Sequence, residues 1–444
     1  MTKRSGNLTA LGLFKWLALS ALLLFGLLLV IFLAGSWVWN YQADSAWAAI
    51  AKELDQKDPD WRWESIERQR RVVPDSENSA RTIIRIQEMT GGREGLEIGR
   101  RIAAEPLDLR PPDADEPSDE VEPLPMPDEW IEGSLPVAIE MLELGERLPP
   151  VLRRELERAL SVYAEAIAVG DRLADQPFGR HPLQVTEDVF STPLATQQFA
   201  RSVVTLMVLE GQRRAAAGDC SHAWRALRSA FNAARSLGDE PFLISALIRI
   251  AGTQMTIRHA EKVLAVGEVR EAELAAWRKL LELEIAEPRL NQCLRGERAM
   301  IVKFTDTALS GKISPSQIVA ERVSSPQFLE DWIARKLIRQ SRPETIRLLT
   351  ELIEQTRQPA DAWIEAIEEW SDRVKQSDLF LARLFGTSMG SVAETEVRHQ
   401  ALLRVALMAT ACEQFRQKHQ RWPNDPVELA TEKFLDQLPT DPYT

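Results

Sequence analysis

Leu17–Leu33 reads LALSALLLFGLLLVIFL, a run without a single charged side chain, and apolar residues continue to Val38 and Trp39. A helix rises about 1.5 Å per residue, so about 20 such residues cross the ~30 Å hydrocarbon layer of a bilayer with every backbone group hydrogen-bonded internally. The run therefore predicts a transmembrane helix over residues 11–39, preceded by a short cytoplasmic tail of residues 1–10.

Charge on either side of the apolar run predicts its orientation. Lys3, Arg4 and Lys15 are the only charged side chains before Asp44. Positive charge favours the cytoplasmic side of a membrane helix. We therefore expect a single-pass protein of the cell (inner) membrane, with a cytoplasmic N-terminus and the bulk of the chain periplasmic or otherwise extracytoplasmic.

A cleaved signal peptide is the alternative to this signal-anchor, because Ala34-Gly35-Ser36 offers small residues at a suitable processing point. The apolar region of a signal peptide usually spans only about 7 to 15 residues, about half of what is present here. This length favours an anchor. A lipoprotein signal is excluded because Ser36 stands where that signal needs a cysteine.

Composition limits the classes of partner. The 444 residues are 45% hydrophobic and 27% charged, which is typical of a globular chain, and carry a net charge of -12. An acidic chain is a poor match for nucleic acid, whose binding depends on Lys and Arg. We expect no nucleic-acid partner. Three widely spaced cysteines, Cys220, Cys293 and Cys412, predict small buried apolar residues, with one disulfide or a reactive thiol as the alternative.

The chain after the anchor is predicted to be all-α. In the juxtamembrane region, residues 40–104, helix should continue to Lys57 and stop at Asp58-Pro59, and a further helix should be capped by Asp75 or Ser76. An acidic, proline-rich linker follows over residues 105–129 (EPLDLRPPDADEPSDEVEPLPMPDE), whose composition cannot offset the entropy of ordering. A calcium site there is disfavoured because prolines interrupt the ligand pattern.

Residues 130–420 predict a domain of antiparallel helical hairpins, ahead of a proline-rich C-terminal tail over residues 421–444. Helical periodicity, punctuated by Gly and Pro, gives ten expected helices: Arg154–Leu173, Pro193–Ala217, Ser221–Leu237, Pro241–Val266, Glu271–Ala286, Arg289–Leu309, Gln327–Arg339, Pro343–Thr356, Pro359–Lys375 and Ala393–Lys418.

One hairpin carries a more specific pattern. Gly218-Asp219-Cys220-Ser221-His222-Ala223, followed by Leu227, Ala230 and Ala234, resembles the second helix of a tetratricopeptide repeat, where glycine permits the turn and alanines permit close helix contact. The next glycine-led start, Gly267, lies 49 residues on from Gly218, which does not fit the 34-residue period. We therefore expect TPR-like or α-solenoid-like packing without a regular array.

The C-terminal segments Phe415–Pro423 and Leu435–Thr444 resemble the end of the major pseudopilins of type II secretion, in which a glycine-containing turn ends a helix and a Leu-Pro-x-Asp-Pro loop follows. Gln420 stands at the usual glycine position. Because a glycine and a short strand pair would be expected after Thr444, the ending looks truncated on this pattern.

A wider set of segments looks like a family of uncharacterised, single-pass, helical bacterial proteins of the planctomycete type. The segments are the apolar run, Trp61–Glu67, Pro74–Ala80, Gly218-Asp219, Arg295–Arg298 and Asp441–Thr444. The resemblance implies membrane topology and an all-α fold, and it implies no activity.

Two acid–histidine pairs are candidates for chemistry. Glu396 and His399 form a Glu-x-x-His pair, but a ferritin-like di-iron site needs two such pairs and two further glutamates. Asp219 and His222 have the same spacing at a helix start, where Asp is a natural cap. We expect a solvated or capping contact in each pair. In Arg295-Gly296-Glu297-Arg298 we expect ion pairing within one helix turn, with a substrate-facing cluster as the alternative.

These observations favour a non-enzymatic scaffold or interaction module that offers a groove to a protein or peptide. GxSxG, Walker, GxGxxG and HExxH motifs are absent, so no catalytic, metal or cofactor residue is predicted, and no cofactor. An accessory of an envelope or secretion system is one alternative. A hydrolase or metal-dependent enzyme is the other, which would require Asp219, His222, Glu297, Glu396 and His399 to converge.

Overall fold

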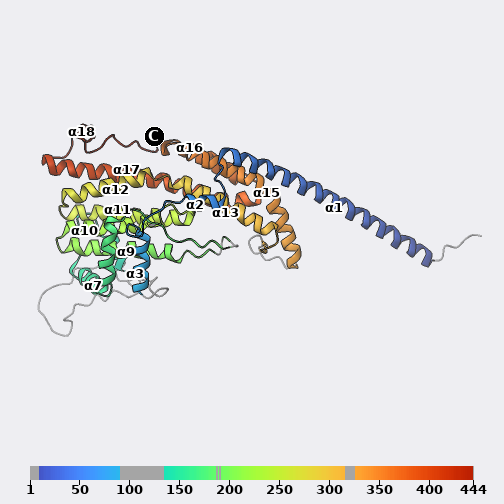
Figure 1. Cartoon of the computed structure of the whole chain (residues 1–444), viewed down its shortest axis with the longest axis horizontal. Helices are drawn as coiled ribbons and strands as arrows, with labels where there is room; N and C mark the ends of the chain where they lie inside the picture. Colours follow the sequence, from blue (N-terminus) through green and yellow to red (C-terminus); the bar gives the residue numbers. More distant parts are fainter. Residues whose placement is uncertain (1–9, 91–134, 187–188, 190–191, 316–325, 444) are drawn as a thin grey trace, which may run out of the picture.

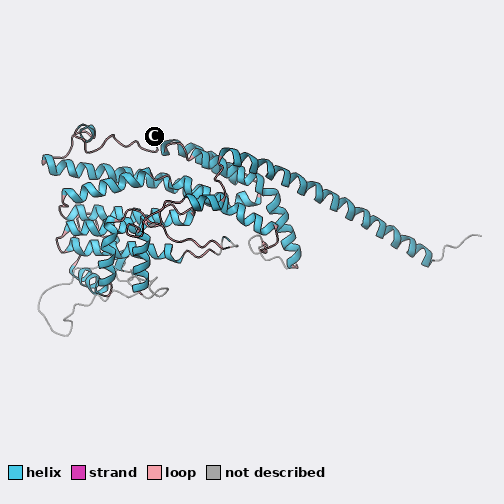
Figure 2. Ribbon diagram, viewed as in Figure 1, coloured by secondary structure: helices cyan, strands magenta, loops and turns pink. Residues whose placement is uncertain are grey.

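The computed structural model describes residues 10–90, 135–186, 189, 192–315 and 326–443. Within these residues every regular element is helical and no strand is present, as Figure 2 shows. The predicted all-α class is therefore confirmed. The predicted linker, residues 105–129, and most of the N-terminal tail lie outside the described residues.

The apolar run belongs to one uninterrupted helix, α1 (Ala10–Lys57), which is 48 residues long. It is the one helix among the described residues that is long and apolar enough to cross a membrane, and its most apolar window is buried nowhere in the protein. Figure 1 shows α1 projecting from one end of the helical domain. Its last turns enter that domain through the buried Ile50 and Leu54. The helix ends before Asp58-Pro59, as predicted.

The domain is assembled from helices of very different length. Their bounds are α2 (Trp63–Gln69), α3 (Ser79–Met89), α6 (Leu135–Met141), α7 (Pro150–Ser161), α8 (Ala164–Gly170), α9 (Ala195–Ala216), α10 (Cys220–Arg235), α11 (Leu243–Val266), α12 (Glu271–Ala286), α13 (Arg289–Leu309), α15 (Gln327–Gln355), α16 (Trp363–Lys375), α17 (Thr387–His419) and α18 (Val427–Thr431). Short 3-10 turns at Asp171–Asp175 and Ala360–Ala362 and a π turn at Ala382–Gly386 connect some of them.

The domain has one end near α1 and one end away from it. The hairpin of α9 and α10 lies at the centre of the end away from α1. Gly218 makes the turn with a φ of 82°, a left-handed conformation that favours glycine. Ala230 and Ala234 are buried, and a Cβ added at Gly252 of α11 would lie only 2.8 Å from the Cβ of Ala234. Small residues thus let α10 lie close to its neighbours, as the repeat-like pattern predicts.

Hairpin packing does not continue through the whole chain. Pro288 separates α12 from α13, and α13 packs chiefly against α15 instead of folding back onto α12. The long helix α17 covers α12 at one end and α16 at the other (Figure 1). Two main apolar cores result, one around α9, α10 and α12 and one where α1 meets α13, α15 and α16.

The predicted cap of α3 is wrong. The helix is capped by Asn78, whose side chain accepts from the Ala80 N–H, and not by Asp75 or Ser76. Asn78 also accepts from the Arg180 N–H, so a contact 102 residues away selects the cap.

Two further expected helices have different bounds. The helix expected over Arg154–Leu173 is divided near Tyr163 into α7 and α8, and a 3-10 turn follows α8. The last long helix, α17, begins at Thr387, ahead of the expected Ala393, because it follows directly from the π turn.

The two helices expected on either side of Pro343 are one helix, α15. Proline usually breaks a helix because it lacks an N–H and its ring crowds the preceding turn. Here Pro343 and its neighbours Ser341, Arg342 and Thr345 are all buried. Tertiary packing therefore outweighs the local preference.

The C-terminal tail packs against the domain. α17 ends at Gln420, which adopts a left-handed φ of 56°, the conformation that glycine usually supplies at a helix end. Leu429 of α18 and Leu435 after it are buried in the core around α9 and α10. Gln420 thus takes the glycine-like turn at the position where the pseudopilin pattern has glycine, and that resemblance stays a prediction.

Candidate functional site

Asp219 and His222 form a capped helix start. The Asp219 carboxylate accepts from the His222 N–H at 3.2 Å and lies 2.7 Å from His222 Nδ1. Both side chains are about half exposed, at 49% and 57%. The hydrogen bond between the Asp219 and His222 side chains is the main reason why the pKa of the Asp219 carboxyl lies below its usual value. The predicted capping contact is confirmed.

Glu396 and His399 are buried, so the prediction of a solvated pair is wrong. His399 is fully enclosed, and its Nε2 lies 3.2 Å from Thr253 Oγ1 on α11. Glu396 accepts two hydrogen bonds from Arg289, at 2.6 and 3.1 Å. The reason is that α17 lies over α11 and α12, which the sequence of α17 alone does not reveal.

The predicted structural ion pairing at Arg295 and Arg298 is confirmed, but the expected partner Glu297 is wrong. Arg295 and Arg298 both bind Asp58, just past the end of α1, and the Arg295 contact is 2.7 Å. Glu297 instead accepts from the Leu243 N–H at 2.9 Å. Gly296 faces the Pro241 carbonyl so closely that a Cβ would collide with it. This motif therefore joins α13 to the end of α1 and to the start of α11.

A buried polar cluster that the sequence analysis did not predict is centred on Glu284 of α12, which is fully buried. Arg249 donates to it at 2.5 and 2.9 Å, Arg289 donates at 2.5 Å, and Arg235 donates to the same carboxylate. Arg289 extends the cluster to Glu396. We call this set the Glu284 cluster. It joins α10, α11, α12, α13 and α17.

The carboxylates and guanidinium groups in and around the Glu284 cluster are nearly equal in number. Glu287 lies 3.6 Å from Arg235 and 3.1 Å from Arg71, so three carboxylates face four guanidinium groups when Arg71 is included. Burial by itself raises the pKa of Glu284, but the three arginines outweigh burial and hold this pKa well below its usual value. Burial lowers the pKa of Arg235 to about 10 and that of His399 to about 3, so His399 is neutral at physiological pH. The carboxylates and guanidinium groups are thus already engaged with one another.

The cavity that the described residues leave beside the Glu284 cluster is too small for a substrate. The cavity at its edge, between Phe178, Arg235, Arg249 and Glu287, measures about 10 Å³, which is about the space of one water molecule. Each member of a buried ion-pair cluster of this kind depends on its partners, because removing one leaves an uncompensated buried charge. Its chemistry is therefore that of a structural junction.

No hydrogen bond or ion pair joins the five residues proposed for an enzyme into one site within the described ranges. Asp219 and His222 contact each other at the exposed start of α10, whereas Glu297 and Glu396 both lie near Cys293 and His399 contacts Thr253. Within the described ranges no group of three His, Cys, Asp or Glu side chains is placed to hold a metal ion. The arrangement required by the enzyme hypothesis is therefore missing from this part of the chain.

None of the three cysteines is an activated thiol, because burial raises the pKa of each. Burial raises the pKa of the Cys293 thiol, and the nearby carboxylates of Glu297 and Glu396 raise it further, which makes the thiol unreactive. All three cysteines are free, so the alternative of a disulfide is wrong. Cys220 and Cys293 are buried as predicted, whereas Cys412 is only half-buried.

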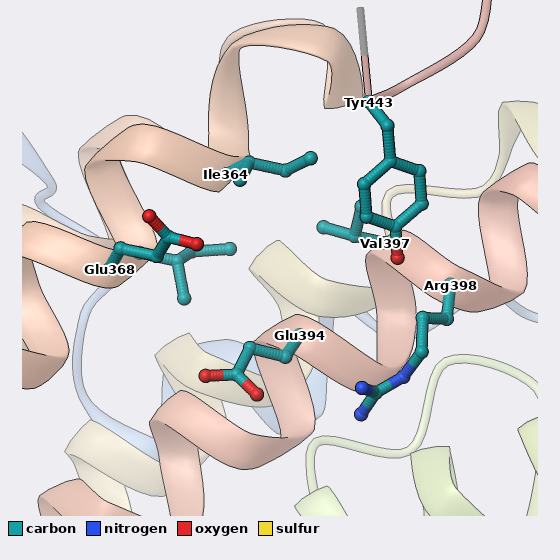
Figure 3. Close-up of a pocket in the computed structure, with 7 residues that line it drawn as sticks. Ile364, Glu368, Glu394, Val397, Arg398 and Tyr443 are labelled. Carbon is teal, nitrogen blue, oxygen red and sulfur yellow. The ribbon is translucent and has the colours of Figure 1, made fainter.

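Three open depressions are described elsewhere. One of about 400 Å³ lies beside α9 and is lined by charged side chains that include Asp171, Glu210 and Arg214. Figure 3 shows the smallest of the three, of about 160 Å³, where the Tyr443 ring lies near Ile364 of α16 and Arg398 of α17.

The largest of the three, of about 520 Å³, lies between α1 and α15. Its apolar floor is Ile50 and Leu54. Its rim mixes acidic and basic side chains, which are Glu53, Lys57, Arg347, Glu351, Glu354 and Arg357. We call it the α1–α15 groove, and its volume is in the range of ligand sites.

No family model, curated protein or solved structure matches the chain. The resemblances to pseudopilins and to single-pass helical bacterial proteins therefore stay predictions, and function has to be argued from the residues themselves.

Proposed function

We propose that the protein is a single-pass, membrane-anchored scaffold that holds a helical domain outside the cytoplasm and offers the α1–α15 groove to a protein partner. The observation that carries the proposal is the continuity of α1. One helix contains both the unburied apolar run and the buried residues Ile50 and Leu54, so the anchor and the domain share a rigid element.

The junction between α1 and the domain supports this role. The Asp58 carboxylate forms ion pairs with both Arg295 and Arg298. The Trp61 indole N–H donates a hydrogen bond of 2.9 Å to the Asp55 carboxylate. Burial tends to raise the pKa of Asp58, but the two arginines lower it overall, so the carboxylate stays charged. A protein that only needed tethering could use a flexible linker. A locked junction suits a protein that must hold its domain in one orientation.

The α1–α15 groove is the surface that best suits a partner. Its floor is apolar, and its rim includes Lys57, paired to Glu53, and Arg357, paired to Glu354. Exposed pairs like these contribute little stability, so a partner can replace them with little loss. A peptide or helix matches this surface if it has one apolar face with charges of both signs along the edges of that face.

Membrane topology can be tested with single cysteines in the native cell. In the proposed topology, Val405→Cys, on an exposed part of α17, reacts with a membrane-impermeant maleimide in spheroplasts, and Lys3→Cys reacts only after the membrane is permeabilised. Cys412→Ala removes the half-buried thiol from the background. The reverse pattern of labelling, or release of the protein by alkaline carbonate, would contradict an anchored extracytoplasmic domain.

The partner can be identified by proximity labelling from the C-terminal end of the chain. We expect Arg357→Glu, in the groove, to lose the main labelled protein. The matched control Lys375→Glu reverses an exposed charge on α16, outside the groove, and should keep it. Equal labelling by both variants would show that the groove is not the contact surface.

An accessory role in an envelope or secretion system is the second candidate. The left-handed backbone of Gln420 favours this role. The pseudopilin pattern has a glycine at this position, and glycine readily adopts that conformation. The same labelling experiment separates the candidates, because this role predicts secretion or envelope components among the labelled proteins.

A further inference from the structure

The first half of α15 exposes a continuous apolar stripe. Phe328 is 76% exposed, and Leu329, Trp332, Ile333 and Leu337 are each 37–43% exposed. Their spacing places them in two neighbouring rows on one face of the helix. Such a face is unusual on a helix that also belongs to a packed domain.

The other face of α15 shows that the stripe is not a misplaced core. Ala334 and Ile338 lie on that side of the helix and are 0% exposed. Arg335 donates to the Ala308 carbonyl at 3.1 Å, which fixes α15 against the end of α13. The helix is thus already seated in the domain, and its apolar stripe points away from it.

The stripe lies beside the apolar part of α1. The rings of Trp332 and Phe32 are 5.9 Å apart between centroids, and Phe32 belongs to the apolar run. The ammonium group of Lys336 lies 4.9 Å from the Trp39 ring and 5.4 Å from the Trp332 ring. The stripe therefore begins where α1 leaves the predicted bilayer.

Contacts further along fix the direction of α15 relative to α1. Arg339 pairs with Asp44 at 3.0 Å, and the guanidinium of Arg342 lies 3.6 Å from the centre of the Trp47 ring. Residue numbers rise together on the two helices, so the start of α15 points toward the same side as the apolar run. Figure 1 shows this end of α15 and α1 extending from the same end of the domain.

We propose that the first half of α15 is a second membrane-contacting element, which inserts its apolar stripe into the outer interface of the bilayer beside α1. The proposal rests on the membrane anchoring proposed above. Lipid is the occupant that the structure favours, because Phe32, which Trp332 contacts, would lie at the outer edge of the hydrocarbon layer. A side chain at that depth that is exposed on the surface of the protein faces lipid.

The order of residues along α15 fits this depth. Lys336 and Trp39 lie together, and cationic and indole side chains of this kind settle at the headgroup level. Phe328 is eight residues earlier than Lys336, about 12 Å along the helix, and amphipathic helices bury their apolar face about 5–10 Å into the interface. The tip of α15 therefore reaches into the acyl region while the rest of the domain stays in water.

The proposal can be tested by measuring label depth in the full chain. Nitroxide labels are placed at Phe328→Cys, at Leu28→Cys in the apolar run and at Val405→Cys on α17, each in a Cys412→Ala background, and the protein is reconstituted in phosphatidylcholine nanodiscs. We expect the label at residue 328 to be relaxed strongly by oxygen and several-fold less by an aqueous nickel chelate than the label at residue 405. A further label at Leu337→Cys should lie at a shallower depth.

The controls separate the two proposals. A water-exposed label at residue 328 together with a lipid-exposed label at residue 28 would overturn the second contact and leave the anchor intact. Water exposure at both positions would overturn the anchor itself. Low accessibility of residue 328 to both reagents would show that protein covers the stripe, for example a second copy of the chain, and would also overturn the proposal.

Discussion

The two ends of the molecule differ in how far their large apolar side chains are covered, although buried ion pairs occur both around Glu284 and between Asp58 and Arg298 near α1. At the end away from α1, large apolar residues such as Trp224 and Phe231 are covered on all sides. At the end near α1, Phe328 and Trp332 are exposed, and Lys336 lies over aromatic rings. The difference indicates that the first end is complete by itself and that the second still needs an apolar surrounding.

The largest effect is expected from breaking the Glu284 cluster. Glu284→Gln leaves Arg235, Arg249 and Arg289 facing a neutral amide, and removing one partner from a buried ion pair typically costs about 3–5 kcal/mol. We expect the free energy of unfolding in detergent, measured by urea titration, to fall by about that amount. Asp372→Asn, which removes an exposed pair with Lys375, is the matched control and should change it by less than about 0.5 kcal/mol. Equal losses would contradict a structural role of the cluster.

A pH-dependent effect is expected from Glu297, whose pKa is raised to about 7, from 4.5, because the surrounding protein removes water from it. Between pH 4.5 and 7 the unfolded chain loses this proton and the folded protein keeps it, so stability falls as pH rises through this window. Relative to Glu297→Gln, which keeps an oxygen for the Leu243 N–H, the natural protein should lose about 3 kcal/mol between these limits. If the free energies of unfolding of the two proteins changed with pH in the same way, Glu297 would be ionised in the folded protein and the prediction would be wrong.

A smaller effect is expected at the start of α10. Asp219→Ala removes the cap of the His222 N–H, and loss of such a cap typically costs about 1 kcal/mol. Asp219→Asn should restore most of the loss, because the amide oxygen still accepts this hydrogen bond. Thermal unfolding of the three proteins measures both steps. A loss that Asn does not restore would point to the charge of Asp219 and not to capping.

The smallest effect is expected on the exposed stripe of α15. Ile333→Ala in detergent should change the free energy of unfolding by about 0.5 kcal/mol or less, because this side chain has no protein core to leave. Ile338→Ala, on the buried face of the same helix, should cost about 2–5 kcal/mol. Urea titration of both variants compares the two faces directly. A large loss at residue 333 would mean that the stripe packs against protein.

Elements with strong local signals could be predicted from the sequence. The expected bounds of Glu271–Ala286 and Arg289–Leu309 agree with α12 and α13 to the residue, because Pro288 and the flanking turn residues act locally. The end of α1 at Lys57 is predicted for the same reason. The Asn78 cap and the passage of α15 through Pro343 depend on contacts between distant residues, which a local pattern does not contain.

The Glu284 cluster could not be assembled from the sequence because its members are spread from Arg235 to Glu396. One signal was nevertheless present. Arg249 is the only charged residue in Leu243–Ala251, which reads LISALIRIA. A lone arginine in so apolar a stretch indicates a buried ionic partner, although it does not reveal which carboxylate supplies it.

The unbroken course of α1 has a mechanical consequence. Its 48 residues make a rod of about 72 Å, with no hinge between the part proposed to lie in lipid and the part held by the domain. Such a rod leans further in a thin bilayer and stands more upright in a thick one. The domain would follow each change of tilt, so the thickness of the surrounding membrane would set the direction in which the α1–α15 groove faces.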